Sequence, residues 1–139
     1  MEADINDLED IIKSIASLLI QYKIIVVKST AGIGTSRRLA NMIYEINKEA
    51  QFDIVSNPEF LRAGSAVKDF MDPDRIILGI ESDRAHTIMT QLYQSFIDKK
   101  IPVVYTKLEE AELIKYAANC FLAMKLGFAN EMAYLCEHI

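Results

Sequence analysis

The side chains with the clearest chemical potential lie in residues 56–62, which read Ser-Asn-Pro-Glu-Phe-Leu-Arg. Pro58 fixes the backbone just past a predicted strand and so places Glu59 at the mouth of a sheet. A carboxylate in that position can act as a general base, particularly when a neighbouring lysine tunes it. A surface turn with a solvated glutamate is at least as common, so both interpretations stay open on these residues alone.

A second group of polar residues lies on a long apolar segment near the C-terminus. At about 100° per residue in a helix, four of them fall within one narrow sector, namely Glu112, Lys115, Asn119 and Asn130. A lysine and an asparagine at positions i and i+4 of an apolar helix need partners, because an unpaired buried ammonium group is costly. The simpler alternative is an exposed helix start, where Glu112, Lys115 and solvent satisfy one another.

The loop after the first predicted strand contains Gly32 and Gly34, two residues apart. This spacing is typical of a dinucleotide-binding turn, but Arg37 occupies the third glycine position and no acidic residue ends the following strand. The glycines therefore indicate a tight turn rather than a phosphate-binding fingerprint. The hydroxyl groups of Ser29 and Thr30, at the end of the strand, are candidates for polar contacts to a ligand.

Alternating strands and helices are predicted to position these residues. Four strands are predicted, at residues 23–28, 52–55, 75–79 and 103–106. Helices are predicted between and around them, at residues 7–21, 37–50, 65–71 and 82–97. This alternation predicts an α/β fold with a four-stranded parallel sheet. Ligands bind beyond the carboxyl ends of the strands in such sheets, which is where the loops at 29–36 and 56–65 are expected.

The last predicted helix runs from about Glu109 to near the end of the chain and is apolar on nearly all sides. A helix that is hydrophobic around its full circumference is a buried one, so we expect burial here. Cys120 and Cys136 lie on this helix, too far apart to pair and without the spacing of zinc ligands, and are predicted to be reduced core thiols. His86 and His138 stand alone and are expected at the surface.

Composition limits the class of protein and its partners. A chain of 139 residues with 51% hydrophobic and 25% charged residues is typical of a soluble globular protein. The net charge is −5 and no basic stripe is present, which excludes a nucleic-acid partner. The first residues are acidic where a signal peptide is basic, and no apolar run reaches the roughly 18 residues of a membrane span. We therefore expect a cytoplasmic protein.

Four stretches together resemble the UDP-glucose 6-dehydrogenase family. They are residues 28–30 with 34–35, residues 56–66, residues 72–76 and residues 112–123. The resemblance covers essentially the whole chain, with the stretches in order and correctly spaced. The residues Phe60, Leu61 and Arg62 after Glu59 favour the UDP-glucose branch over the GDP-mannose and UDP-N-acetylmannosamine relatives.

The resemblance implies a reaction and a role for each residue. Members of the family oxidise the sugar C6 alcohol to a carboxylate with two NAD, through a thioester on a cysteine. By resemblance Glu59 activates water to hydrolyse the thioester, and Lys115 stabilises an oxyanion or alkoxide with Asn119 beside it. Ser29 and Thr30 would lie against the NAD cofactor. Contacts to UDP-glucose would come from Phe60, Leu61, Arg62, Ala63, Lys115 and Asn119.

The resemblance also implies how the chain is organised. Residues 1–107 would form the C-terminal half of a Rossmann-like NAD-binding domain, and residues 108–139 the start of the central helical domain. In the family the long helix of that domain packs against its counterpart in a second subunit. A homodimer through the C-terminal helix is therefore expected.

Several departures from the family pattern leave the function open. Neither the glycine fingerprint of the NAD site nor the nucleophilic cysteine lies within these 139 residues, and Cys120 and Cys136 do not match that nucleophile. Ala63 stands where the family usually has a second Glu, and Gly32 where it usually has Pro. Three hypotheses follow: a fragment of the enzyme that is inactive alone, a subunit of a split enzyme, and a non-catalytic dimerising interaction module.

Overall fold

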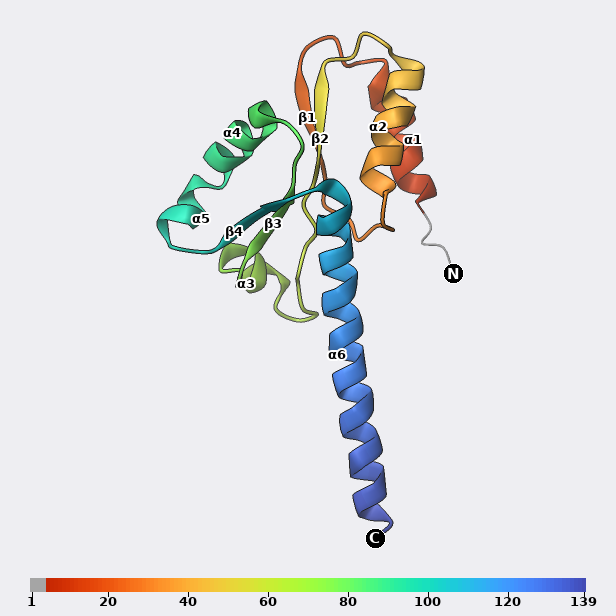
Figure 1. Cartoon of the computed structure of the whole chain (residues 1–139), viewed down its shortest axis with the longest axis vertical. Coiled ribbons are helices and arrows are strands. Elements are labelled where there is room, and N and C mark those ends of the chain that lie inside the picture. Colours follow the sequence, from red (N-terminus) through yellow and green to blue (C-terminus); the bar gives the residue numbers. More distant parts are fainter. Residues whose placement is uncertain (1–4) are drawn as a thin grey trace.

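The computed structural model describes residues 5–139 and shows an α/β unit from which one long helix projects (Figure 1). The strands are β1 (Lys23–Val27), β2 (Phe52–Ser56), β3 (Ile76–Gly79) and β4 (Val103–Thr106). The helices are α1 (Asn6–Ala16), α2 (Thr35–Ile46), α3 (Ala66–Met71), α4 (Asp83–Leu92), α5 (Gln94–Asp98) and α6 (Leu108–Glu137). The first four residues of the acidic N-terminus lie outside the described residues.

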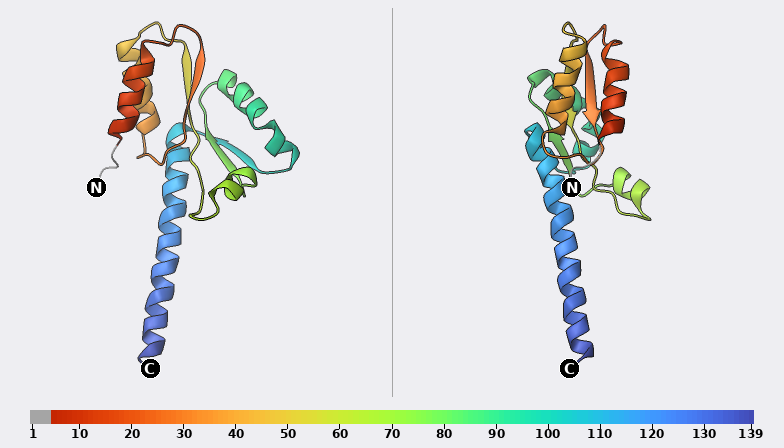
Figure 2. Two further views of the ribbon diagram at one scale, coloured as in Figure 1. Left: turned by 180° about the vertical axis from the view of Figure 1, so that it is seen from behind. Right: turned by 90° about the vertical axis from the view of Figure 1, so that its right-hand side faces the viewer.

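The first half of the sheet is the predicted βαβ unit. β1 and β2 pair in parallel, with Lys23 opposite Phe52 and Val27 opposite Ser56. Helices α1 and α2 lie side by side on one side of these strands, away from α4 and α5 (Figures 1 and 2). A core of buried apolar side chains joins them, including Ile12, Leu39, Ile43, Phe52 and Ile54. The parallel pairing of the first two strands is therefore confirmed.

The prediction that all four strands are parallel is wrong at one junction. The strand order is β1-β2-β3-β4, and β3 pairs in parallel with β4, but β2 meets β3 in an antiparallel contact of one residue pair, Ser56 with Gly79. A parallel return needs a long crossover packed on a sheet face. The connection between β2 and β3 provides none, because α3 is its only helix and buries no residue. The carboxyl ends of β2 and β3 consequently point toward each other.

The second half of the sheet has a core of its own. Ile76 and Leu78 of β3 pack with Ala85 and Met89 of α4, all of them buried. The predicted helix at 82–97 is broken into α4 and α5 at Tyr93, whose φ and ψ of −94° and 9° interrupt the helix. The break turns the Tyr93 hydroxyl toward the end of β2, where it is hydrogen-bonded.

Helices α1 and α2 are shorter at their C-terminal ends than the periodicity predicts. Helix α1 ends at Ala16 rather than residue 21, because the chain tightens there into short-range turns, with Leu18 N–H donating to Ile15 O at 2.9 Å. Helix α2 ends at Ile46, and Asn47 adopts an extended conformation. The Asn47 Nδ2 then donates to Ala16 O at 3.0 Å, which joins the two helix ends.

The long helix α6 is unbroken from Leu108 to Glu137, as predicted. Its first turn packs tightly on the end of β3, where a Cβ atom on Gly79 would come within 2.9 Å of Leu108 Cα and of Ala111 Cβ. A glycine is therefore required at that position. At the start of α6 the Glu110 carboxylate accepts a hydrogen bond from the Lys107 N–H at 3.1 Å, which caps the helix.

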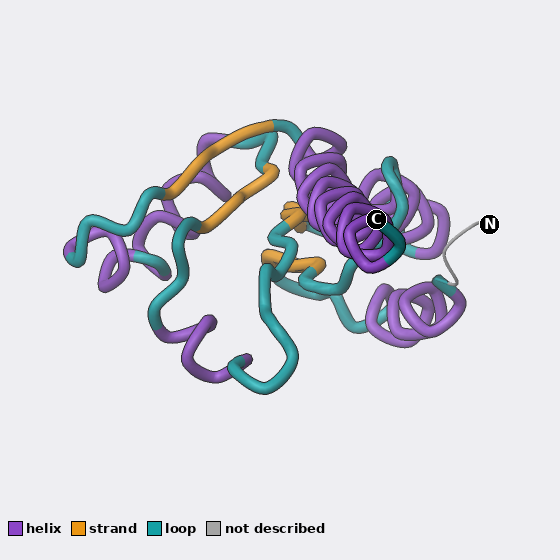
Figure 3. The backbone as a smooth tube through the Cα atoms, turned by 90° about the horizontal axis from the view of Figure 1, so that it is seen from below, coloured by secondary structure: helices purple, strands orange, loops and turns teal. Residues whose placement is uncertain are grey.

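The prediction that α6 is buried is wrong for most of its length. Only its first turns contact the sheet, and the buried residues of α6 are Leu108, Ala111, Glu112 and Lys115. Beyond Asn119 every residue is exposed, because the helix projects past the sheet (Figure 1); Figure 3 views this helix nearly end-on from its C-terminal end. Cys120 and Cys136 are free, as expected, but exposed rather than in a core. Of the helices in residues 5–139, none combines the length and apolarity that a bilayer span requires.

Candidate functional site

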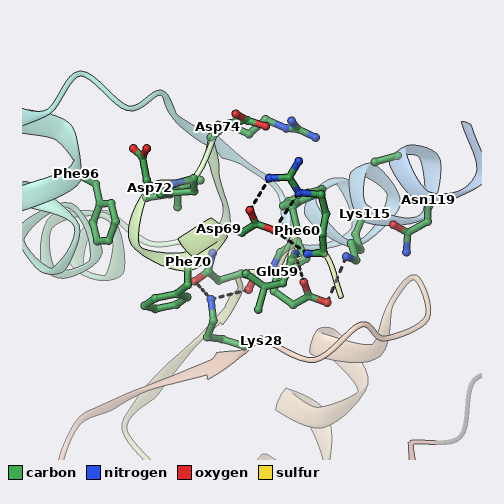
Figure 4. Close-up of a pocket in the computed structure, with 18 of the residues that line it drawn as sticks. Lys28, Glu59, Phe60, Asp69, Phe70, Asp72, Asp74, Phe96, Lys115 and Asn119 are labelled. Atoms are coloured by element: carbon green, nitrogen blue, oxygen red, sulfur yellow. Dashed lines mark hydrogen bonds and ion pairs between the residues drawn. The ribbon is translucent and has the colours of Figure 1, made fainter. Parts of the chain in front are cut away.

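A cavity of about 270 Å³ opens where the two halves of the sheet meet the start of α6 (Figure 4). It is lined by the segment after β2, by the end of β1, by the turn before β3 and by one face of α6. Among the residues predicted for the site, six line it: Glu59, Phe60, Leu61, Arg62, Lys115 and Asn119. Ser29, Thr30 and Ala63 are exposed and are not part of the lining.

An ion pair across the cavity joins two segments that are far apart in the sequence. The Nζ of Lys115, on α6, donates to Oε1 of Glu59 at 3.3 Å. The Lys115 side chain is 7% exposed and the Glu59 side chain 31%, so the lysine is held by the protein while the carboxylate faces the cavity. The second carboxylate oxygen, Oε2, accepts from the Leu61 N–H at 2.5 Å. The structure therefore places a lysine beside the Glu59 carboxylate.

The ring of Phe60 lies near two cations in the wall of the cavity. The Arg75 guanidinium lies 4.6 Å from the ring centroid and the Lys115 ammonium 5.2 Å from it. An aromatic face attracts cations through its quadrupole, so the ring holds both groups without neutralising either charge. Arg75 is therefore placed to meet an anionic group in the cavity, while Lys115 is paired with Glu59.

The exposed loop between Glu59 and α3 is held by one carboxylate, that of Asp69. Its two oxygens accept from the Arg62 backbone N–H at 2.9 Å, from the Arg62 guanidinium at 2.6 Å and from the Ser65 hydroxyl at 2.9 Å. The hydrogen bonds from Arg62 hold the pKa of Asp69 well below its usual range. Arg62 therefore points into an internal ion pair, and its guanidinium is engaged before any ligand arrives.

Three polar side chains, at the ends of β1, β2 and α4, form a hydrogen-bond network beside Glu59. Lys28 Nζ donates to Asn57 Oδ1 at 2.8 Å, and the Tyr93 hydroxyl donates to the same oxygen at 2.5 Å. Burial lowers the pKa of Lys28, an effect that the charge of Glu59 opposes. Burial also raises the pKa of Tyr93. Glu59 thus lies between two lysines, Lys28 and Lys115.

Glu112 and Lys115 are both buried and bind different partners, so the alternative of an exposed helix start is wrong and the four polar positions do not form one seam. Its carboxylate caps the start of α2: it accepts from the Gly34 N–H at 2.6 Å, the Ser36 N–H at 2.8 Å and the Ser36 hydroxyl at 2.7 Å. Gly34 has a φ of 87°, so the glycine does occupy a tight turn. Glu112 is 4% exposed and Lys115 5%, whereas Asn130 is exposed beyond the cavity.

Replacing this buried cap should destabilise the whole unit. Glu112→Ala leaves the donors of Gly34 and Ser36 unpaired, so we expect the free energy of unfolding to fall by about 2–4 kcal/mol. Glu131→Ala is the matched control, because Glu131 is exposed on the same helix. Urea denaturation of the two variants measures the difference. Equal stability of both would show that the carboxylate contributes nothing net.

The comparisons with known proteins agree with this architecture. Residues 1–97 match the sequence model of the UDP-glucose/GDP-mannose dehydrogenase family, NAD binding domain, and residues 109–139 match that of the central domain of the same family. The chain belongs to the UDP-glucose/GDP-mannose dehydrogenase family. The resemblance inferred from the sequence stretches is therefore confirmed.

Individual members of the UDP-glucose/GDP-mannose dehydrogenase family show the extent of the match. The UDP-glucose 6-dehydrogenases of Rhizobium meliloti and Bacillus subtilis are 42% and 44% identical over 139 residues. The alignments cover 99% of this chain but 32% and 30% of those enzymes, so the chain spans about a third of the length of the curated relatives it matches.

Solved structures of the UDP-glucose/GDP-mannose dehydrogenase family share the fold. The UDP-glucose dehydrogenase of Pyrobaculum islandicum superimposes with a TM-score of 0.86 at 37% identity, over 94% of this chain and 31% of that one. A ternary complex of the Pseudomonas aeruginosa GDP-mannose dehydrogenase gives 0.82 at 27% identity, over 92% of this chain and 30% of that one.

Sequence reasoning missed the side chains that hold this dehydrogenase-family site in place. Lys28, Asn57 and Tyr93 come from three separate segments, and no spacing links them in the sequence. Lys28 and Asn57 lie in stretches that carry the family resemblance, but no role was predicted for either residue. An asparagine at a predicted strand end, directly before Pro58, was a signal in the residues themselves, because such an amide has to find partners if it is buried. Among residues 5–139, no group of three or more metal-ligating side chains is placed to hold a metal ion.

Proposed function

We propose that the chain carries part of the active site of an NAD-dependent dehydrogenase that oxidises UDP-glucose to UDP-glucuronate. The observation that carries the proposal is the Glu59–Lys115 pair, which faces a cavity at the carboxyl ends of two strands. In this role Glu59 is the base that activates water. Lys115 stabilises negative charge on the reacting oxygen, with Asn119 beside it on the same face of α6.

The proposed contacts to the sugar nucleotide follow from the lining of the cavity. Phe60 and Leu61 face it directly, and the cations of Lys115 and Arg75 suit an anionic or polar ligand. Arg62 lines the cavity while bound to Asp69, and Ala63 lies just beyond the lining. We keep residues 60–63, Lys115 and Asn119 as the proposed substrate contacts, with Ala63 acting through its backbone.

NAD accepts hydride when it is bound, and the described chain provides only part of a site for it. Ser29 and Thr30 are exposed at the carboxyl end of β1, and neither hydroxyl has a hydrogen-bond partner among residues 5–139. They are free to contact a cofactor. The N-terminus of α2, which could cradle a phosphate, already donates to the Glu112 carboxylate. We therefore propose that Ser29 and Thr30 touch NAD and that its pyrophosphate is held elsewhere.

The whole reaction needs groups that these 139 residues do not provide. We propose that residues 1–107 form the C-terminal half of an NAD-binding domain and that residues 108–139 begin a helical domain. The missing nucleophile and phosphate-binding turn would come from further segments of the same polypeptide or from a second chain. The exposed apolar surface of α6 supports the proposal that the helix is an association surface.

Binding of UDP-glucose tests the proposal without requiring turnover. We expect UDP-glucose, added to the ¹⁵N-labelled chain, to shift the amide resonances of residues 59–62, Lys115 and Asn119. UDP alone should shift them less, because these residues are proposed to contact the sugar. Lys115→Met should weaken binding about tenfold, the factor expected for loss of a hydrogen bond to a charged group.

Lys125→Met is the matched control for this experiment. Lys125 is exposed on the same helix, outside the cavity lining. Removing its charge changes the net charge of the chain by the same amount as Lys115→Met, so a difference between the two variants isolates the site. Equal affinity of Lys115→Met and Lys125→Met for UDP-glucose would contradict the assigned role of Lys115.

A further inference from the structure

Both ends of the Asn57 side-chain amide are hydrogen-bonded beside the cavity. Its Nδ2 donates to Ile77 O of β3 at 2.8 Å, and its Oδ1 accepts from Lys28 Nζ at 2.8 Å and from the Tyr93 hydroxyl at 2.5 Å. Its backbone N–H donates to Val27 O of β1 at 2.9 Å. The residue is 2% exposed, so these bonds form away from competing water.

These hydrogen bonds of Asn57 take the place of the ladder of backbone hydrogen bonds that is missing between β2 and β3. The two parallel strand pairs of the sheet meet in a single antiparallel contact between Ser56 and Gly79. One such contact contributes little to fixing the angle between the two halves, which α6 also bridges by packing on β2 and β3. Asn57 adds a hydrogen bond to β3, one to β1 and one to Tyr93, which ends α4. The amide therefore fixes how the end of β2 sits against the second half of the sheet.

The orientation of the amide is determined by its partners. The Lys28 ammonium can only donate, so the oxygen of Asn57 faces it and also accepts from Tyr93, while the amide nitrogen faces the carbonyl of Ile77. An aspartate would keep the two donors satisfied but would place a carboxylate oxygen against that carbonyl oxygen. Asn57→Asp is therefore a near-isosteric change that reverses one interaction.

Only Pro58 separates this amide from Glu59. Pro58 is buried and its ring fixes φ, so the direction in which the chain leaves Asn57 determines where the Glu59 carboxylate lies. We infer that Asn57, held by Lys28 and Tyr93, is a positioning residue that orients Glu59 toward Lys115. The inference rests on the proposed function only in naming Glu59 as the acting carboxylate.

The N–H of Leu61 reports the position of Glu59 directly, because it donates to the Glu59 carboxylate at 2.5 Å. Amide hydrogen exchange of the ¹⁵N-labelled chain, followed by NMR without any ligand, therefore measures the placement. In Asn57→Asp we expect the Leu61 amide to exchange about tenfold faster, the factor for loss of a hydrogen bond to a charged group. Tyr93→Phe and Lys28→Met each remove one donor and should accelerate it less.

Asn47→Asp is the matched control. Asn47 also uses its Nδ2 to bind a backbone carbonyl, that of Ala16 at 3.0 Å, but it does so at the far ends of α1 and α2. It should lower the denaturation midpoint while leaving Leu61 exchange within about twofold of the wild-type rate, because its site shares no partner with Glu59. If Asn57→Asp does not fold, Tyr93→Phe and Lys28→Met carry the test.

Two outcomes would overturn the inference. One is wild-type Leu61 exchange in the folded variants of Asn57, Tyr93 and Lys28. The other is equal acceleration in Asn47→Asp, which would show that Leu61 reports global opening. Because no ligand is present, this result is independent of UDP-glucose binding. Faster Leu61 exchange in the variants, with no resonance shifts when UDP-glucose is added, would support Asn57 as a positioning residue and contradict the proposed function.

Discussion

No NADH should form when the 139-residue chain alone is mixed with NAD and UDP-glucose. Covalent catalysis through a thioester needs a cysteine beside the substrate, and losing the nucleophile removes that route altogether. Cys120 and Cys136 are both exposed on α6, and neither lines the cavity. The start of α2, the candidate phosphate cradle, is occupied by the Glu112 carboxylate. The absorbance of NADH, followed over hours at high protein concentration, measures the result.

The Bacillus subtilis UDP-glucose 6-dehydrogenase serves as the positive control in the same assay. Turnover to the glucuronate by the chain alone would contradict the proposal that the nucleophile and the phosphate-binding turn come from other segments. A second arm adds a separately produced chain that carries the glycine fingerprint and the cysteine segment of a relative. NADH formation only in that mixture would support the split-enzyme hypothesis, and its absence would favour a fragment or an interaction module.

Much of this fold could be predicted from the sequence because local patterns are decisive there. The β-branched run at residues 23–28 forms a parallel strand, and the helical periodicity of residues 37–50 predicts α2, although the helix ends four residues earlier. The antiparallel contact between β2 and β3 could not be predicted. It depends on whether the connection packs on the sheet, and a six-residue helix with no buried side chain leaves no signal of that kind.

The candidate site likewise has a part that could be predicted from the sequence and a part that could not. Pro58 indicates where Glu59 lies, and the polar positions of α6 indicate Lys115, so both members of this pair could be predicted from the sequence. Glu112 was not, because its partners lie at the start of α2, 76 residues away in the sequence. The spacing of Glu112 and Lys115 suggested one seam, but Glu112 binds the start of α2 while Lys115, one turn further along the helix, binds Glu59.

The exposed part of α6 carries a continuous apolar stripe. At about 100° per residue, Phe121, Met124, Phe128 and Met132 lie on one face of the helix. They are 58%, 62%, 66% and 40% exposed. Each contributes roughly 1.5–3 kcal/mol when fully buried, and together they make a patch of the size that marks interaction surfaces. Most of the stability of helices in proteins comes from tertiary packing, so the exposed part of α6 depends on whatever covers the stripe.

A second copy of the chain is the simplest cover, since a two-fold contact buries the same stripe on both subunits. We therefore expect a dimer or larger species, and Phe121→Asp/Phe128→Asp should shift it to monomer and lower the helicity of α6.

The control Ala123→Asp/Asn130→Asp adds the same charges at the same seven-residue spacing on the opposite face, and should leave the dimer intact. Light scattering over a range of concentrations measures the mass, and circular dichroism measures the helicity. A wild-type monomer at high concentration would show that α6 folds back onto its own sheet, and equal dissociation by both double variants would show that the stripe is not the interface.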